Sequence, residues 1–209
     1  ACMKKINLIS HEIDLAQSEV LHDLRRSSPE QWRLRRGGGR WEVTADGLRA
    51  YHMPDDKMLH GQIFYAEPIV GDVMLEFDAR LLPPSSHDLV WLWQTSFEAM
   101  PWGEGYLGCL GGWYGDYAGI EKLPTFEPSA IFAAHPLETG RDYRIVSGTV
   151  GGIVFIALDG ELLLRFADPR PVANSKPGFI GFGFYQSDVE YRNIRILRPR
   201  TTPRMPSYE

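Results

Sequence analysis

The chain has 209 residues, of which 44% are hydrophobic and 23% are charged, as in an ordinary globular protein. Its net charge of −5 argues against nucleic acid or an anionic membrane as a partner, because both require a basic face. No apolar run approaches the ~18 residues that a membrane-spanning helix needs. Length and composition therefore favour one domain, residues 1–209, with a sizeable hydrophobic core.

The N-terminal segment, residues 3–28, is the one stretch that we expect to be helical or irregular. Its apolar side chains recur at loose helical spacing: Ile13, Leu15, Val20, Leu21 and Leu24. Pro29 then ends the pattern. The start of the chain leaves two locations open. If Met3 is the natural start, a cytoplasmic protein is expected; if Cys2 is a lipoprotein cysteine, the cell envelope is expected.

Short strands are predicted from Trp32 onward, where hydrophobic residues begin to alternate with polar ones. The expected strands cover residues 32–34, 41–43, 48–52 and 61–66. Glycine-containing turns separate the first of them, at residues 37–39 and 46–47. This pattern is typical of antiparallel sheet.

The clearest strand is predicted over residues 72–82. Its odd-numbered residues are apolar, whereas Glu76, Asp78 and Arg80 share the opposite face. The next strand, residues 89–95, is apolar on both faces and is therefore expected in the middle of a sheet. Its pattern leaves open whether Trp91 and Trp93 point into the core.

Residues 102–122 combine many glycines with aromatic side chains. Glycine lets the backbone bend or be approached closely, and aromatic rings offer a flat apolar face. Such a stretch suits the C–H face of a sugar ring. It is equally typical of a β-sandwich that turns a corner, and both interpretations stay open.

Further strands are expected over residues 143–146, 153–158, 161–166, 179–185 and 189–197, with a tight turn at Asp159-Gly160. The tail from Arg198, including residues 199–209, contains three prolines and is predicted to be extended or disordered. Many short strands with almost no helix predict an all-β fold: an antiparallel β-sandwich of jelly-roll type over residues 30–198.

The closing residues 176–196 resemble the end of jelly rolls in the concanavalin A-like lectin/glucanase family. A strand reading Gly-x-Ile-Gly, residues 178–181, is followed by the aromatic–x–Asn–Ile–x–Ile pattern that begins at Tyr191. Residues 154–161 and 72–80 resemble earlier strands of the same family. The resemblance covers most of residues 30–198. It extends in particular to small bacterial proteins of the DUF1961 type, some of which accompany pectin-degrading systems, and more distantly to keto-disaccharide hydrolases.

This resemblance implies the fold and a carbohydrate-active function, but one family signature is missing. The Glu-x-Asp-x-x-Glu motif of family 16 glucanases would begin at Glu76, yet no second glutamate follows Asp78. Same-face neighbours on a strand lie about 6.5–7 Å apart, which suits an inverting pair at ~6.5–9.5 Å better than a retaining pair at ~5–5.5 Å. The alternative is that both carboxylates are solvated or paired with Arg80.

The candidate site residues follow from these patterns. The candidate catalytic acids and bases are Glu76, Asp78, Glu121 and His135. The candidate substrate-binding residues are Trp91, Trp93, Trp113, Tyr114, Arg80, Arg144 and Lys122. No histidine spacing predicts a metal site and no cofactor is expected, although the fold class leaves room for a structural calcium with Asp116 as a ligand. The two cysteines, Cys2 and Cys109, give no disulfide framework.

The first hypothesis is therefore a glycoside hydrolase or polysaccharide lyase that acts on an oligosaccharide or polysaccharide. The alternatives are a non-catalytic carbohydrate-binding module and a structural protein whose Gly-aromatic stretch contacts a partner. The substrate, the reaction and the oligomeric state do not follow from the sequence.

Overall fold

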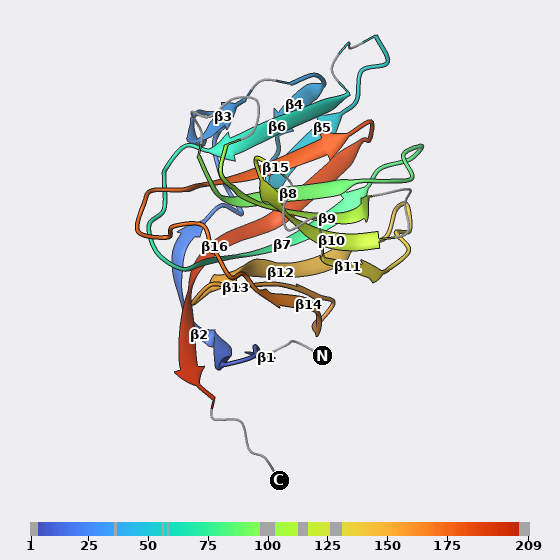
Figure 1. The fold of residues 1–209 in the computed structure, drawn as a ribbon. Coiled ribbons are helices and arrows are strands. Elements are labelled where there is room, and N and C mark those ends of the chain that lie inside the picture. Colours follow the sequence, from blue (N-terminus) through green and yellow to red (C-terminus); the bar gives the residue numbers. More distant parts are fainter. Residues whose placement is uncertain are drawn as a thin grey trace.

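A computed structural model describes residues 4–35, 37–55, 57, 59–96, 103–112, 117–125 and 131–204, with residues 131 and 132 described by their backbone alone. Within these ranges the chain forms two antiparallel sheets and no α-helix (Figure 1). No helix in the described part of the chain is long and apolar enough to cross a membrane. The predicted all-β sandwich is confirmed.

The first sheet, sheet A, has nine strands among the described residues. In chain order they are β1 (Lys5–Asn7), β2 (His11–Asp23), β4 (Arg40–Val43), β5 (Gly47–Tyr51), β7 (Val73–Leu81), β12 (Tyr143–Val150), β13 (Ile153–Leu158), β14 (Glu161–Ala167) and β16 (Val189–Pro203). Their spatial order is β1-β2-β16-β7-β12-β13-β14, and β5 joins β16 with β4 beside it.

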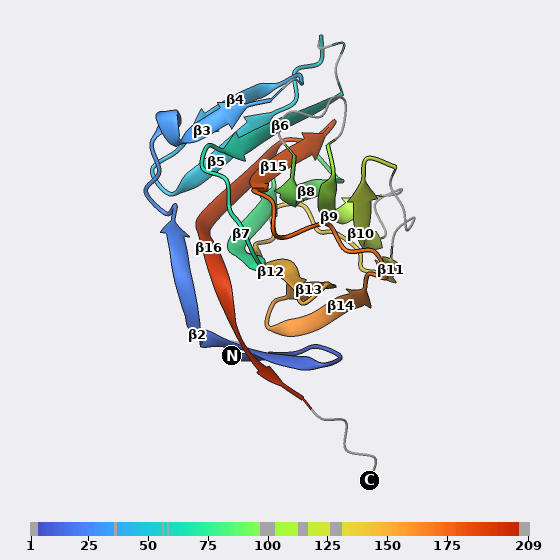
Figure 2. The same ribbon diagram turned by 60° about the vertical axis from the view of Figure 1, so that its left-hand side comes forward.

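The second sheet, sheet B, has seven strands in the same described ranges. They are β3 (Trp32–Leu34), β6 (His60–Tyr65), β8 (Leu89–Thr95), β9 (Gly105–Gly112), β10 (Tyr117–Leu123), β11 (Ile131–Ala134) and β15 (Phe179–Tyr185). Their spatial order is β11-β10-β9-β8-β15-β6-β3. A short 3₁₀ turn, η1 (Pro29–Gln31), leads into β3. In the rotated view of Figure 2, the β12-β13-β14 region of sheet A lies below β8 and β15 of sheet B, and β11 lies beside β14.

The long strand β16 organises sheet A because two different strands share one of its edges. Its first residues pair with β5, and its last residues pair with β2 as far as Pro203. The other edge pairs with β7, with a register shift between Arg192 and Arg195. Asn193 lies in this shift with φ 53°, a backbone conformation that asparagine tolerates better than most residues.

The prediction for the N-terminal segment is wrong. Residues 3–28 are expected to be helical or irregular, yet β1 and β2 are strands. The tail from Arg198, predicted to be extended or disordered, is extended strand as far as Pro203, and residues 205–209 lie outside the described residues. β2 is a strand because it pairs with the end of β16, which is far from it in sequence. Such pairing overrides the local periodicity of apolar residues.

The main core lies between the inner faces of the two sheets. Its large side chains include Trp91 and Trp93 from β8, Phe77 from β7 and Tyr191 from β16, all with 0% exposed surface. Tyr191 also links the sheets, because its hydroxyl lies 2.8 Å from the amide nitrogen of Val90 and 2.8 Å from the carbonyl oxygen of Gly183. A smaller core forms where the β1–β2 hairpin packs with Met74 and Phe155.

Glycine in the Gly-aromatic stretch serves the packing of this core. A Cβ atom at Gly108 of β9 would lie 2.4 Å from the indole of Trp91 on the neighbouring strand. The missing side chain therefore makes room for a buried tryptophan. This supports the sandwich-packing interpretation for the described part of the stretch.

Candidate functional site

The carboxylates of Glu76 and Asp78 lie on the outer face of sheet A, and both are engaged by basic or amide side chains. The Arg144 guanidinium lies 2.6 Å from Glu76 Oε1 and donates to Asp78 Oδ1 at 2.9 Å. Asn193 Nδ2 donates to Asp78 Oδ2 at 2.6 Å, and Arg195 pairs with Glu76. Each carboxylate is therefore part of an ion pair, which leaves neither arranged as a free acid or base.

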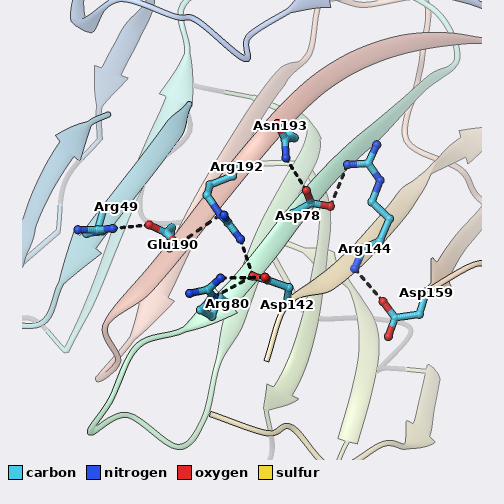
Figure 3. Close-up of polar contacts among 9 residues, drawn as sticks. All are labelled: Arg49, Asp78, Arg80, Asp142, Arg144, Asp159, Glu190, Arg192 and Asn193. Atoms are coloured by element: carbon cyan, nitrogen blue, oxygen red, sulfur yellow. Dashed lines mark hydrogen bonds and ion pairs between the residues drawn. The ribbon is translucent and has the colours of Figure 1, made fainter. Parts of the chain in front are cut away.

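Arg80 has a different partner from the one expected. It forms two hydrogen bonds of 2.8 Å to Asp142, and Arg192 shares the same carboxylate (Figure 3). The hydrogen bond from Arg80 holds the pKa of Asp142 below its usual value. Glu190 bridges Arg192 to Arg49 on β5. We call the paired charges on this outer face, which lie across β5, β16, β7 and β12, the Arg–carboxylate ladder. Its members are Arg49, Glu190, Arg192, Asp142, Arg80, Asp78, Arg144, Glu76 and Arg195.

The Arg–carboxylate ladder thus contains four predicted site residues: Glu76, Asp78, Arg80 and Arg144. The guanidinium of Arg144 is occupied by protein carboxylates, so it is not free to clamp a sugar carboxylate. The more exposed pairs of the ladder, such as Arg80–Asp142, contribute about 0–1 kcal/mol each. The ladder fits a charge-paired outer face of sheet A better than an active site.

The predicted aromatic platform is wrong for its two described members. Trp91 and Trp93 have no exposed surface and point into the main core. Trp93 stacks on Tyr106 and donates its indole N–H to the Thr149 hydroxyl at 2.8 Å. Trp113 and Tyr114 lie outside the described residues.

Lys122 and His135 lie in two further places. Lys122 donates to the buried carboxylate of Asp168 at 2.8 Å, which ties it to the loop after β14. His135 follows β11, at the edge of sheet B, and its ring packs edge-on at 6.1 Å from the ring of Tyr143. Neither lines the same cavity as Glu121, a cavity that opens on the outer face of sheet B.

A cavity of about 310 Å³ opens on the outer face of sheet B, and we call it the central cavity. It spans five adjacent strands, β10, β9, β8, β15 and β6. Its lining includes Gln62, Asp88, Val90, Cys109, Glu121, Gly183 and Tyr185. Among the residues that the structure describes, Glu121 is the one predicted site residue in this lining. Strand alternation explains why the tryptophans of β8 are absent from this lining. Trp91 points inward, so its neighbour Val90 faces outward.

Acidic groups gather around the thiol of Cys109, which is a free and buried cysteine. Its Sγ donates to Asp88 Oδ1 at 3.1 Å, and Glu121 lies on the strand at its other side. Burial raises the pKa of the Asp88 carboxyl above its usual value, and burial together with Asp88 raises the pKa of the thiol. The thiol is thus protonated at neutral pH. The Asp88 carboxylate, with its raised pKa, takes up a proton at a higher pH than an ordinary aspartate does.

Asp88 and Tyr185 are two of the cavity residues that the sequence analysis missed. Asp88 precedes β8 in a left-handed conformation, φ 69°, and its short polar segment carries no motif. Tyr185 ends β15 with 42% of its surface exposed and contacts His87. The alternation along β15 could have placed Tyr185 opposite Phe184, but only the structure shows which face borders a cavity.

The calcium suggested from the fold class stays untested. Among the described residues, no three His, Cys, Asp or Glu side chains come together as a ligand set for a metal. Asp116, the suggested ligand, and Cys2 both lie outside the described residues.

No protein-family model matches the sequence, and no curated protein matches it. Solved structures share its fold. The carbohydrate-binding module CBM66 from Bacillus subtilis is 16% identical with a TM-score of 0.64, over 80% of this chain and 96% of that chain. The Bacillus licheniformis β-glucanase is 8% identical with a TM-score of 0.64, over 88% and 100%. The lumenal domain of VIP36, bound to Ca²⁺ and Man3GlcNAc, is 14% identical with a TM-score of 0.61, over 93% and 92%. The chain therefore has the antiparallel jelly-roll sandwich fold of these lectin, glucanase and carbohydrate-binding structures.

Proposed function

We propose that the protein binds a carbohydrate in the central cavity on the outer face of sheet B. The observation that carries this proposal is that Asp88 and Glu121 line the same mostly apolar cavity, together with the partly exposed ring of Tyr185. Ligand sites are commonly concave and mostly apolar, with a few placed polar groups. A sugar needs both parts, since its C–H face packs on apolar or aromatic surface and its hydroxyls donate to carboxylates.

The fold likeness supports the same ligand class. One structural neighbour is a carbohydrate-binding module, a second is a β-glucanase and a third holds a mannose-containing glycan. Fold alone does not determine function, so the assignment depends on the cavity. We also propose that the chain is related to the bacterial DUF1961-type proteins that its closing strands resemble.

Substitutions in the central cavity are expected to weaken oligosaccharide binding. Asp88→Asn should raise the Kd about tenfold or more, because a hydrogen bond to a charged group contributes about 1.5–3 kcal/mol. Gly183→Val should abolish binding by filling the floor, where a Cβ atom would lie 3.3 Å from Val90 Cγ1. Calorimetric titration with a panel of neutral and acidic oligosaccharides measures both.

The matched control is the double variant Glu76→Gln/Asp78→Asn in the Arg–carboxylate ladder. It removes two carboxylates from the opposite sheet and should leave the Kd unchanged. Loss of binding in this control, with Asp88→Asn and Gly183→Val still binding normally, would contradict the proposed site.

A second candidate function, hydrolysis or elimination on the bound sugar, is favoured by one observation. The pKa of Asp88 is raised by burial, as a general acid requires, and a second carboxylate lines the same cavity. Asp88 precedes β8 and Glu121 lies on β10, so the two residues lie on opposite sides of β9.

Catalysis predicts product release that depends on both carboxylates. Asp88→Asn should lower kcat about 10²–10⁴-fold, and the activity should fall as pH rises through the raised pKa of Asp88, since the acid must be protonated. Reducing ends report hydrolysis, and new ultraviolet absorbance reports elimination. Binding without either signal across the panel would leave a carbohydrate-binding protein.

A further inference from the structure

A second cavity, which we call the edge cavity, lies at the other end of the strands on the outer face of sheet B. Its volume is about 510 Å³. Its lining includes Arg33, Gln94, Ser96, Glu104, Lys176 and Phe179. Gln94 follows Val90 and Leu92 on the same face of β8, so about 13 Å of strand separates the two cavities. Phe64 of β6 lies in sequence between Gln62, which lines the central cavity, and Pro68, which lines the edge cavity. The guanidinium of Arg35 lies 5.5 Å from the centre of the Phe64 ring.

Gln94 is the unusual residue of this cavity. Only 6% of its surface is exposed, and neither Nε2 nor Oε1 of its amide has a hydrogen-bond partner in the structure as described. Buried polar groups in folded proteins are nearly always paired, so each exception calls for an explanation. A ligand that both accepts from Nε2 and donates to Oε1 supplies one.

The backbone around Gln94 is also distorted. Its φ is 51°, which is uncommon for a residue other than glycine, and the pairing of β8 with β15 shifts register between Phe179 and Gly181. Bulges of this kind redirect a side chain, and they are frequent next to binding sites. The distortion therefore accompanies the unpaired amide, and the unpaired amide itself points to the ligand.

The charges around the edge cavity indicate the sign of that ligand. Arg33 and Lys176 are both exposed, and neither forms an ion pair with another described residue. Glu104 is the one carboxylate among the lining residues in the described ranges. Two unpaired cations against one carboxylate favour an anionic group beside the amide.

We propose that the edge cavity binds an anionic sugar residue, with the Gln94 amide on neighbouring hydroxyls and with Arg33 and Lys176 on the acidic group. A vicinal diol matches a side-chain amide, because one hydroxyl donates to Oε1 while the other accepts from Nε2. This inference rests on the proposed carbohydrate function and deepens it. A uronate and a sulfated sugar share this chemistry and are separated by the test.

The first arm of the test is Gln94→Met, which keeps the size of the side chain and removes both amide groups. The Kd for glucuronate or galacturonate should rise about tenfold or more, as expected when hydrogen bonds to a ligand are lost. The midpoint of thermal unfolding should rise by about 2–4 °C, because an unpaired buried amide has been replaced by an apolar group. A falling midpoint with unchanged affinity would show a structural amide and overturn the proposal.

The second arm tests the charge. Titrations followed by NMR compare uronates with glucose and galactose and with their 6-sulfated forms. Tighter binding of either anionic form supports the proposal and names the acidic group, whereas equal binding of the neutral sugars overturns it. Arg33→Ala/Lys176→Ala should remove the preference. The charge-matched control is Lys4→Ala/Arg204→Ala, at the β1–β2 hairpin and beyond the end of β16, and it should retain the preference.

The two proposals fail in different ways. If Gly183→Val abolishes binding and Gln94→Met does not change it, the edge-cavity proposal is wrong and the central cavity stands. If Gln94→Met weakens binding and Gly183→Val does not, the edge cavity is the site and the central-cavity proposal is wrong. If the wild-type protein binds no sugar in the panel, both are wrong.

Discussion

Trp91→Ala is expected to lower the free energy of unfolding by about 3–5 kcal/mol, the range for truncating a large aromatic side chain in a core. Trp91 has no exposed surface and packs edge-on against Phe77, with 5.6 Å between the ring centres. The residue against its indole is Gly108, which has no side chain to fill the space that truncation of Trp91 leaves. Denaturant unfolding followed by circular dichroism measures the change.

The phenylalanine variants of Trp91 and Trp93 make this prediction sharper. The indole N–H of Trp91 has no partner among the described residues, whereas that of Trp93 donates to the buried hydroxyl of Thr149. Trp93→Phe should therefore cost about 1–3 kcal/mol more than Trp91→Phe, because it leaves the Thr149 hydroxyl without that partner. An equal or reversed cost would show that the two indoles are not held as described.

The exposed aromatic ring provides the functional contrast. Tyr185→Ala should change stability by no more than about 0.5 kcal/mol, since 42% of its surface is exposed. If a sugar packs on this ring, the same variant should weaken oligosaccharide binding. Trp91→Ala is thus expected to lower stability, whereas Tyr185→Ala is expected to weaken binding and leave stability almost unchanged.

The sequence was sufficient to predict the strands whose pattern is local. Alternation along Val73–Leu81 predicted both the strand and its faces, including the shared face of Glu76, Asp78 and Arg80. The partners of these side chains depend on which strands pair. Arg144 reaches Asp78 because β12 pairs with β7 in the register that sets these two residues opposite each other. That register is a long-range property, so no local pattern carries it.

The candidate site was harder to predict for the same reason. Both faces of β8 are apolar, because one face packs in the main core and the other packs in a smaller cluster in which Leu92 contacts residues such as Phe64 and Leu107. The tryptophans on β8 attracted a functional interpretation, although their size makes them efficient core residues. The residues that line the cavities, such as Asp88 and Gln94, come from single polar positions with no motif. Their importance appears only when neighbouring strands surround them.

The N-terminal segment shows how tertiary pairing decides secondary structure. Residues 11–23 carry apolar side chains at loose helical spacing, yet they form a long strand that pairs with β16. Ile13 is fully buried there, packed with Ile6 and Leu197 in the smaller core. Burial against a distant strand thus outweighs a weak local preference.

Asp168→Asn is expected to destabilise the protein by about 3 kcal/mol at neutral pH, the lower end of the range for breaking a buried ion pair. The Asp168 side chain is 2% exposed and its partner Lys122 is 20% exposed. The same carboxylate accepts from the Tyr106 hydroxyl at 2.7 Å and from the Arg170 amide at 2.9 Å. It thereby connects the loop after β14 in sheet A to β9 and β10 in sheet B.

The pH dependence of this effect follows from the pKa of Asp168. Burial alone would raise that pKa, but the hydrogen bonds from Lys122, the Arg170 amide and Tyr106 hold it below the ordinary value of 3.8. A lowered pKa in the folded state means that the stabilisation is complete above pH ~4 and is lost as pH falls through the folded pKa. The difference in stability between wild type and Asp168→Asn should therefore narrow below pH ~4.

Asp142→Asn in the Arg–carboxylate ladder is the matched control, because its pKa is also lowered by a basic partner. Its side chain is 51% exposed, so solvent screens the pair and the expected loss is no more than about 1 kcal/mol. Urea unfolding of both variants between pH 3 and pH 7 compares them. Equal losses would mean that burial of Asp168 adds nothing. A larger loss for Asp168→Asn would show that the buried contacts of Asp168 with Lys122, Tyr106 and the Arg170 amide join the two sheets.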